Sequence, residues 1–230
     1  MPFWFSELIN LFYPQVCAAC NNGLFKGEEV ICTQCLYHLP KTQFHKTPGN
    51  PVEKQFWGKV PVHSGTALYY FNKGERVQQL IHRLKYHGEK EVGTFAGRIL
   101  GADLRKSDRF NTIDLVIPVP LHASKLRSRG FNQADYFGIG LSESLGVPFI
   151  SDFLVRTKAT ETQTHKSRFE RYQNVNQLFL LNPKHAGEPR HFLLVDDVIT
   201  TGSTLTSCVA SLLESPKAKV SIATIAYARL

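Results

Sequence analysis

Two adjacent aspartates, Asp196 and Asp197, stand between an apolar run and a short loop rich in hydroxyl groups. The apolar run, Phe192 to Val195, is typical of a strand that is covered on both faces of a parallel sheet. The loop consists of four hydroxyl-bearing residues and one glycine, namely Thr200, Thr201, Gly202, Ser203 and Thr204. Its N–H groups lie at the N-terminus of the helix that the next apolar positions predict, where an anion is favoured. Carboxylates suit the hydroxyls of a ribose, directly or with a divalent metal, so the segment predicts a site for a phosphorylated sugar.

Each half of this pattern also has a common structural explanation. Adjacent aspartates usually form a solvated turn, and loops of Thr, Ser and Gly are usually caps and turns. The order of strand, acid pair, loop and helix favours the functional interpretation, because it is much harder to obtain by accident. The segment from Leu193 to Thr204 resembles the phosphoribosyl-pyrophosphate (PRPP) signature of the type I phosphoribosyltransferases, which ends in Thr-Thr-Gly-x-Thr. That resemblance implies that Asp196 and Asp197 are a catalytic pair holding the ribose, and that the loop binds the 5′-phosphate.

Four of the five cysteines form two C-x-x-C pairs, Cys17/Cys20 and Cys32/Cys35. Four thiolates with this spacing can surround one Zn²⁺ tetrahedrally, with no ligand position left open for catalysis. Disulfides or a redox pair are the alternatives, but disulfides are disfavoured in a cytoplasmic protein, and two paired motifs fit a metal better. We therefore expect a structural zinc, which in small modules contributes on the order of 10 kcal/mol to folding. We expect the fifth cysteine, Cys208, to be a buried apolar residue.

A basic segment follows a second predicted strand, residues 114–121, which ends at Pro118 and Pro120 because proline cannot extend a central ladder. The carboxyl end of such a strand opens onto the ligand crevice of an α/β sheet. The residues that we expect in a pyrophosphate loop there are Pro120, Leu121, His122, Lys125, Arg127 and Arg129. Their cationic groups would make strong, charge-assisted contacts with phosphate oxygens. The alternative is a basic surface loop without function, in which His122 is a hydrogen-bonded structural residue.

A long polar segment, Thr157 to Asn176, separates two short apolar strands predicted at residues 153–155 and 178–181. A polar segment of this length within a compact domain is usually a lid or disordered. The lid residues that we expect over PRPP are Thr160, Gln163, Lys166, Arg168 and Arg171. Closure of such a lid would exclude water from a reactive sugar centre.

Strands and helices alternate along the main part of the chain. We expect further strands at residues 66–71 and 219–228, and helices at residues 74–87, 92–104 and 131–145. This alternation predicts an α/β fold with a doubly wound, mostly parallel sheet. Residues 39–64 are polar and rich in Pro and Gly, as in a linker and the start of the main domain. We therefore divide the chain into an N-terminal helix, four-cysteine zinc module and linker (1–64) and a phosphoribosyltransferase-like domain (65–230).

The formal net charge of +8 favours polyanionic partners. No apolar run is long enough to span a bilayer. Residues 1–13 are apolar but lack the basic flank and small-residue cleavage site of a secretory signal, and we expect an amphipathic helix there. The expected location is therefore the cytoplasm, without a membrane span.

The chain as a whole resembles the ComF/GntX family, the competence protein ComF group of bacterial phosphoribosyltransferase-like proteins. The matching features are the cysteine pairs, the acid-pair loop, the lid pattern and the runs Leu84-Lys-Tyr-His-Gly88, Pro118-Val-Pro-Leu121 and Arg129-Gly-Phe-Asn-Gln133. The resemblance implies the type I phosphoribosyltransferase fold. It also implies a role in natural transformation, in which the protein handles incoming single-stranded DNA beside the uptake helicase.

Three functional interpretations remain open. A working phosphoribosyltransferase would hold PRPP with Mg²⁺ and transfer its phosphoribosyl group to an unidentified base. A DNA-binding module would grip a sugar–phosphate backbone and stack bases on aromatic side chains, for which the candidates are Tyr86, Phe131, Phe169 and Tyr172. A scaffold would dock a partner through the zinc module and leave the phosphate site unused. We rank the scaffold last, because an unused site has little reason to keep an unbroken acid-pair loop and lid.

Overall fold

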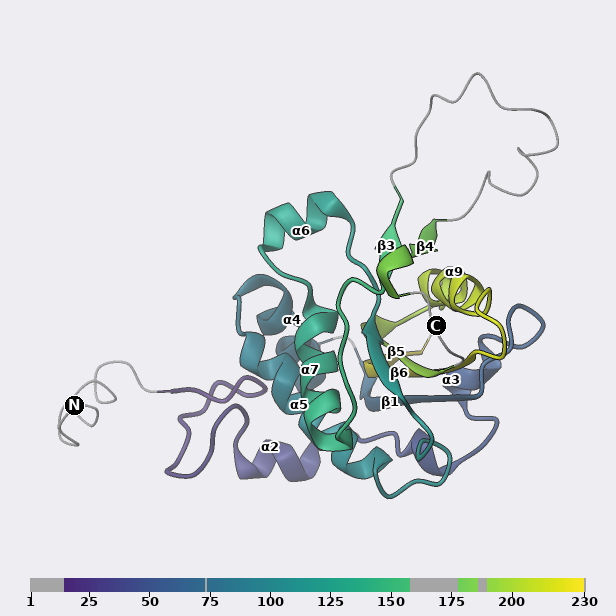
Figure 1. The fold of residues 1–230 in the computed structure, drawn as a ribbon. Helices are drawn as coiled ribbons and strands as arrows, with labels where there is room; N and C mark the ends of the chain where they lie inside the picture. Colours follow the sequence, from purple (N-terminus) through teal and green to yellow (C-terminus); the bar gives the residue numbers. More distant parts are fainter. Residues whose placement is uncertain (1–14, 73, 158–177, 186–189, 230) are drawn as a thin grey trace.

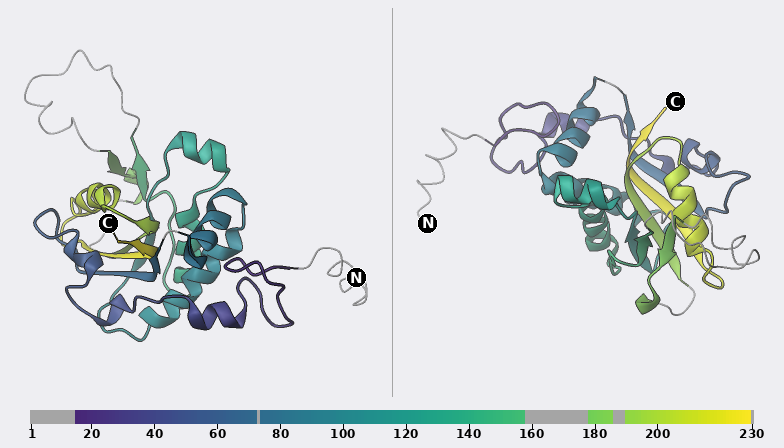
Figure 2. Two further views of the ribbon diagram at one scale, coloured as in Figure 1. Left: turned by 180° about the vertical axis from the view of Figure 1, so that it is seen from behind. Right: turned by 90° about the horizontal axis from the view of Figure 1, so that it is seen from above.

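The computed structural model describes residues 15–72, 74–157, 178–185 and 190–229 (Figure 1). Its central sheet is built from β1 (Ser64–Phe71), β2 (Leu115–Pro118), β5 (His191–Ile199) and β6 (Lys219–Ala228). The four strands have the order β1-β6-β5-β2, and all neighbours are parallel. Helices cover both faces of the sheet, which confirms the predicted α/β fold class (Figure 1, Figure 2).

Three helices pack on one face of the sheet: α4 (Arg76–Tyr86), α5 (Lys90–Leu104) and α7 (Gln133–Leu145). Helices α5 and α7 are so close that a Cβ on Gly97 or Gly140 would collide with the backbone of the other helix. The Asn132 side chain caps α7 and donates a hydrogen bond of 3.1 Å to the carbonyl oxygen of Val119. This bond ties the start of α7 to the chain that leaves β2.

The other face is covered by α9, two short helices and a ribbon. These elements are α9 (Ser203–Leu212), η1 (Phe44–Lys46), α3 (Pro51–Lys54) and the antiparallel strands β3 (Leu154–Arg156) and β4 (Phe179–Leu181), followed by η2 (Pro183–His185). Cys208 is buried in the core of this face, as predicted. The ribbon leads into the predicted lid at residues 158–177, which lies outside the described residues together with Thr160, Gln163, Lys166, Arg168 and Arg171.

Strand β5 is longer than the apolar run predicts. It continues through the acid pair to Ile199, because β6 is long enough to pair with it: Asp196 lies opposite Thr224, and Val198 lies opposite Ala226. The acids are therefore held in a central strand and do not lie on a loop beyond it.

The basic segment after β2 is also different from the prediction, because it is a helix and not a loop. Helix α6 spans Ala123–Arg129. The His122 side chain accepts a hydrogen bond from the Ser124 N–H, and Gly130 ends the helix in the left-handed region with a φ of 77°. Both ends are thus capped, which stabilises a helix too short to show an apolar stripe.

The polar passage before β1, where we expect the linker and the start of the main domain, is packed structure. The Asn50 side chain caps α3 and donates a 2.8 Å hydrogen bond to the carbonyl oxygen of Gly65. The Glu53 carboxylate accepts a 2.9 Å bond from the Gly65 N–H and pairs with Arg109. These contacts hold the buried Phe56 on the sheet. The division of the chain at residues 64 and 65 stays a prediction.

The cysteine-bearing segment, residues 15–39, lies on the α4 and α5 side of the molecule and contains α2 (Thr33–His38) (Figure 2). Its buried residues Ala18, Ile31 and Leu39 share one core with α4 and α5. Residues 1–14, where we expect an amphipathic helix, lie outside the described residues. Within the part of the chain that the structure describes, no helix has the length and apolar character needed to cross a membrane.

Candidate functional site

The carboxyl edge of the sheet brings together groups from several elements. Figure 1 shows α6, the β3–β4 ribbon and α9 on the same side of the molecule, and the acid pair lies in β5. The positive charge of Lys125 on α6 acts on the carboxyl group of Asp196, so the helix contributes charge to the acid pair. Open α/β sheets bind their ligands at this edge.

Lys85, in the last turn of α4, forms an ion pair with Asp197. The Lys85 Nζ lies 2.9 Å from Asp197 Oδ2, and the two side chains are only 21% and 14% exposed. At this degree of burial the ammonium group neutralises the carboxylate and fixes its position.

Asp196 holds its proton more tightly than an ordinary carboxylic acid. Burial and the neighbouring charge of Asp197 raise the pKa of Asp196 to about 7. Its Oδ1 accepts a 2.8 Å hydrogen bond from the Asp197 N–H, and this bond and the charges of Lys85 and Lys125 oppose the rise. Asp196 can therefore exchange a proton near neutral pH. A bound cation or the hydroxyl donors of a sugar would favour its ionised form.

The loop between β5 and α9 surrounds a helix N-terminus with hydroxyl groups. Gly202 is the residue before the helix and has a φ of 73°, in the left-handed region. The hydroxyl oxygens of Thr201 and Ser203 are 3.1 Å apart. The exposed hydroxyl-bearing residues are Thr200, Thr201, Ser203 and Thr204. Unpaired amides and hydroxyls at a helix N-terminus suit a phosphate group.

Gln55 and Phe56, which follow α3, lie next to Gly202 of this loop. A Cβ on Gly202 would lie 3.1 Å from Gln55 Oε1 and 3.4 Å from the Phe56 ring. The Gln55 Oε1 atom is buried and has no hydrogen-bond partner within the described chain. The positive φ favours glycine at this position, and a Cβ would also require the end of the Gln55 side chain to shift by a few tenths of an ångström.

The residues predicted for the pyrophosphate loop are divided between helix α6 and the connection that joins it to β2. Lys125 and Arg127 are exposed on α6, whereas Pro120 and Leu121 lie in the connection from β2. The His122 Nδ1 is 2.7 Å from the Ser124 hydroxyl and accepts from the Ser124 N–H at 3.2 Å, so this ring is engaged in the helix cap.

Two arginines, on α6 and on β3, contact aromatic rings. Arg129 donates a 2.7 Å hydrogen bond to Gln133 Oε1, and its guanidinium lies 5.4 Å from the centre of the Tyr86 ring. Arg156, the last residue of β3, lies 5.4 Å from the centre of the Phe179 ring. Its Nε is buried without a partner among the described residues.

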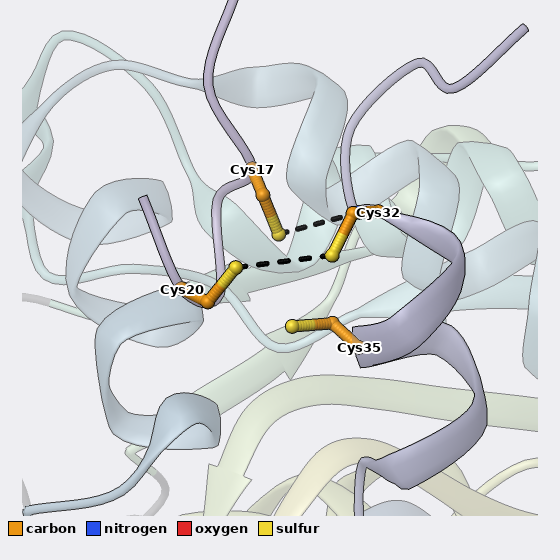
Figure 3. Close-up of side chains that lie close together, drawn as sticks. All are labelled: Cys17, Cys20, Cys32 and Cys35. Carbon is orange, nitrogen blue, oxygen red and sulfur yellow. Dashed lines mark hydrogen bonds between the residues drawn. The ribbon is translucent and has the colours of Figure 1, made fainter. Parts of the chain in front are cut away.

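The four paired cysteines converge on one point (Figure 3). Their Sγ atoms all lie within 4.8 Å of one another, and those of Cys20 and Cys32 are 3.8 Å apart. A tetrahedral zinc with Zn–S bonds of about 2.3 Å places its sulfurs about 3.8 Å apart. The cluster of Cys17, Cys20, Cys32 and Cys35 could therefore hold a metal ion such as zinc.

Amide donors favour the thiolate form of one cysteine of the cluster, Cys17, whereas burial raises the pKa of Cys20 and Cys35. The Cys32 N–H donates to Cys17 Sγ at 3.3 Å. Burial raises the pKa of Cys17, but this and other amide donors outweigh burial and lower the pKa to about 7. Amide N–H groups aimed at sulfur thus stabilise the charged ligand.

Comparison with known proteins identifies relatives along most of the chain, although no protein-family model matches it. The chain is 30% identical over 211 residues to the DNA utilization protein YhgH of Escherichia coli K12, with 90% of this chain and 88% of the relative covered. It is also 30% identical over 211 residues to competence protein F of Haemophilus influenzae, with 84% and 89% covered. The chain belongs to the ComF family. A more distant member, competence protein ComFC of Bacillus subtilis, is 26% identical over 217 residues, with 85% of this chain and 82% of that one covered.

Solved structures similar to this ComF-family chain are those of phosphoribosyltransferases. The PRPP amidotransferase of B. subtilis aligns with a TM-score of 0.42 and 22% identity over 63% of this chain and 30% of that longer chain. The adenine phosphoribosyltransferase of Leishmania tarentolae aligns with a TM-score of 0.38 and 13% identity, with 82% and 94% covered. The family assignment rests on the sequence relatives.

Lys85 is the residue of the ComF-family site that our choice of candidates missed. It lies in the run Leu84 to Gly88, which contributes to the family resemblance, so a signal was present. The run alone does not indicate an ion pair, because a lysine near a helix end is usually a solvated surface residue. The pair with Asp197 forms because α4 packs beside β5.

Proposed function

We propose that this chain binds the ribose 5-phosphate part of PRPP, or of a related ribose-phosphate, at the carboxyl edge of its sheet. The observation that carries the proposal is the arrangement of a charge-balanced acid pair directly before an open helix N-terminus. Asp196 and Asp197 would accept hydrogen bonds from the ribose hydroxyls. The residues that would hold the 5′-phosphate are Thr200, Thr201, Gly202, Ser203 and Thr204.

The remaining phosphates of PRPP would meet cationic groups from other elements. Lys125 and Arg127 are exposed on α6 and would contact the pyrophosphate, next to Pro120 and Leu121. Mg²⁺, bound together with PRPP, would neutralise the negative oxygens. The predicted lid would close over the ligand from the end of the β3–β4 ribbon.

We further propose that the protein acts in DNA uptake in the cytoplasm by handling single-stranded DNA, beside a DNA-uptake helicase. Support for this role comes from its relatives, which are named for DNA utilization and competence. The net charge of +8 and the exposed cations of α6 are consistent with a polyanionic partner. The cysteine cluster would hold a structural Zn²⁺ and thereby order the N-terminal module.

Transfer of the phosphoribosyl group to an unidentified base is the second candidate function. Asp196 favours it, because a carboxyl group with a pKa of about 7 can give or take a proton under physiological conditions. The acid pair would mainly stabilise positive charge that develops on the sugar ring. Release of pyrophosphate from PRPP in the presence of a nucleobase would demonstrate this activity.

Calorimetric titration of the full chain with PRPP and Mg²⁺ tests the ribose-phosphate site. We expect Asp197→Asn to weaken binding by at least about tenfold, the effect of losing about 1.4 kcal/mol of charge-assisted hydrogen bonding. Glu143→Gln is the matched control, since Glu143 forms an ion pair with Arg98 on the exposed surface of α5 and α7. Equal affinities of the wild type and Asp197→Asn, or no PRPP binding by the wild type, would refute the proposal.

Titration with single-stranded oligonucleotides over a salt series tests the DNA role separately. Binding through phosphate contacts should weaken steeply as salt rises. Asp197→Asn should leave this binding nearly intact, because the change adds no repulsion toward a polyanion. If the variant loses PRPP and DNA binding to the same extent, the two sites are not separate.

A further inference from the structure

A row of planar side chains lies on the exposed side of the end of α4. The Tyr86 and His82 rings are 4.8 Å apart between centroids, and the His82 and His87 rings are 5.3 Å apart. Tyr86 is 64% exposed, and both histidines are exposed. Rings that are this accessible contribute little to the core, so a ligand can reach them.

Cationic groups surround the row. The Arg129 guanidinium lies 5.4 Å from the Tyr86 ring centre and is held by its hydrogen bond to Gln133. Lys85 precedes Tyr86 in the chain and pairs with Asp197, so the row begins at the rim of the acid-pair site. Two further exposed cations, Lys125 and Arg127, lie on the helix that ends at Arg129.

Aromatic faces beside a positively charged path are the combination with which proteins hold single-stranded nucleic acid. Bases stack on the rings, and the cations contact the backbone phosphates. A duplex does not offer its base faces, because each base is already stacked between its neighbours. The surface therefore fits a single strand better than a double one.

We propose that Tyr86 is a stacking platform for a base of single-stranded DNA, with Lys125 and Arg127 contacting the adjacent phosphates. The inference rests on the proposed role in DNA handling and adds the surface and the residue that would carry it. Arg129 fixes the ring from one side, and His82 extends the platform away from the acid pair.

Local packing is the alternative explanation, since His82 and Tyr86 are one helical turn apart and such residues often contact each other. A second exposed aromatic residue distinguishes the two explanations. Trp57 is 63% exposed, and Lys54 lies 5.8 Å from its ring centre, but it follows α3 on the other face of the sheet. Trp57→Ala is therefore a matched control, in which an equally accessible ring beside a cation is removed.

Fluorescence anisotropy with a labelled oligothymidylate and the full chain provides the test. We expect Tyr86→Ala to weaken binding by roughly tenfold, Tyr86→Phe to retain wild-type affinity, and Trp57→Ala to have no effect. The salt dependence should be unchanged in Tyr86→Ala, because no phosphate contact is lost. It should become shallower in Lys125→Ala, which loses one such contact.

An oligonucleotide of abasic sites isolates the stacking contribution. Wild type and Tyr86→Ala should bind it equally, and a DNA duplex should likewise be insensitive to the substitution. The inference is overturned if Tyr86→Ala binds oligothymidylate like the wild type, or if its loss is the same for the abasic strand. A wild type that binds PRPP but no single strand would overturn the DNA role and this surface, and leave the ribose-phosphate site standing.

Discussion

Lys85 Nζ lies 2.9 Å from Asp197 Oδ2, and this contact joins the end of α4 to the central strand of the sheet. The pair positions one carboxylate of the acid pair and balances its charge before any ligand is bound. We expect a double-mutant cycle with Lys85→Met and Asp197→Asn to give a coupling energy of about 1–2 kcal/mol in urea unfolding.

The Arg98–Glu143 pair supplies the control for this cycle. Its side chains are 54% and 47% exposed, so solvent screens the charges. We expect its coupling energy to be below about 1 kcal/mol. Equal coupling energies for the two pairs would show that burial does not strengthen the Lys85–Asp197 contact.

Asp196 should make the free energy of unfolding fall as the pH rises toward neutral. Its pKa in the folded protein is about 7, above the ordinary value of 3.8, so the folded state binds the proton more tightly than the unfolded state. This group therefore stabilises the fold most below its ordinary pKa, and the contribution is lost as the pH rises to about 7. Asp196→Asn, which cannot ionise, should be more stable than the wild type by about 1–3 kcal/mol at about pH 8 and by less at about pH 5. Urea unfolding at both pH values measures the difference; a constant difference would contradict the assignment.

Alanine substitutions at Gly202 and Gly130 distinguish the cost of backbone strain from the cost of a close contact with a neighbouring side chain. Both have positive φ, 73° and 77°, but a Cβ would meet Gln55 and Phe56 at Gly202 and open space at Gly130. Gly130→Ala should lower the free energy of unfolding by about 1 kcal/mol through strain alone. Gly202→Ala should lower it by about 1 kcal/mol more, and should also weaken PRPP binding, because the loop and the Gln55 side chain must move apart. Thermal unfolding and calorimetry check both effects, and equal losses of stability would exclude the close contact.

Purified protein should contain one zinc per chain, which elemental analysis measures. Cys35→Ser should lose the metal and lower the melting temperature, because Ala18, Ile31 and Leu39 share a core with α4 and α5 and are held there by the cluster. Cys208→Ala removes a thiol that lies in the core of the other face, and it should retain the zinc. Freshly purified wild type without zinc would defeat the metal assignment.

Local patterns account for what could be predicted from the sequence. The apolar run before Asp196, the hydroxyl loop with Gly202 and the start of a helix follow one another in the chain, so their order alone predicts strand, loop and helix. The spacing within each cysteine pair likewise predicts a knuckle. The prediction was wrong for α6, which is a helix and not a loop, because a short capped helix leaves no periodic apolar signal; the helix α3 before β1 has no such signal either.

The acid-pair loop and the two cysteine pairs could be predicted because their residues are close together in the chain, and the parallel α/β class could be predicted from the alternation of strands and helices. The contacts of Lys85 with Asp197, of Gln55 with Gly202 and of Arg129 with Tyr86 could not be predicted in this way. The physical reason is the same in each case. These partners lie on different elements, and their distance is set by how helices pack on the sheet, which no single segment encodes.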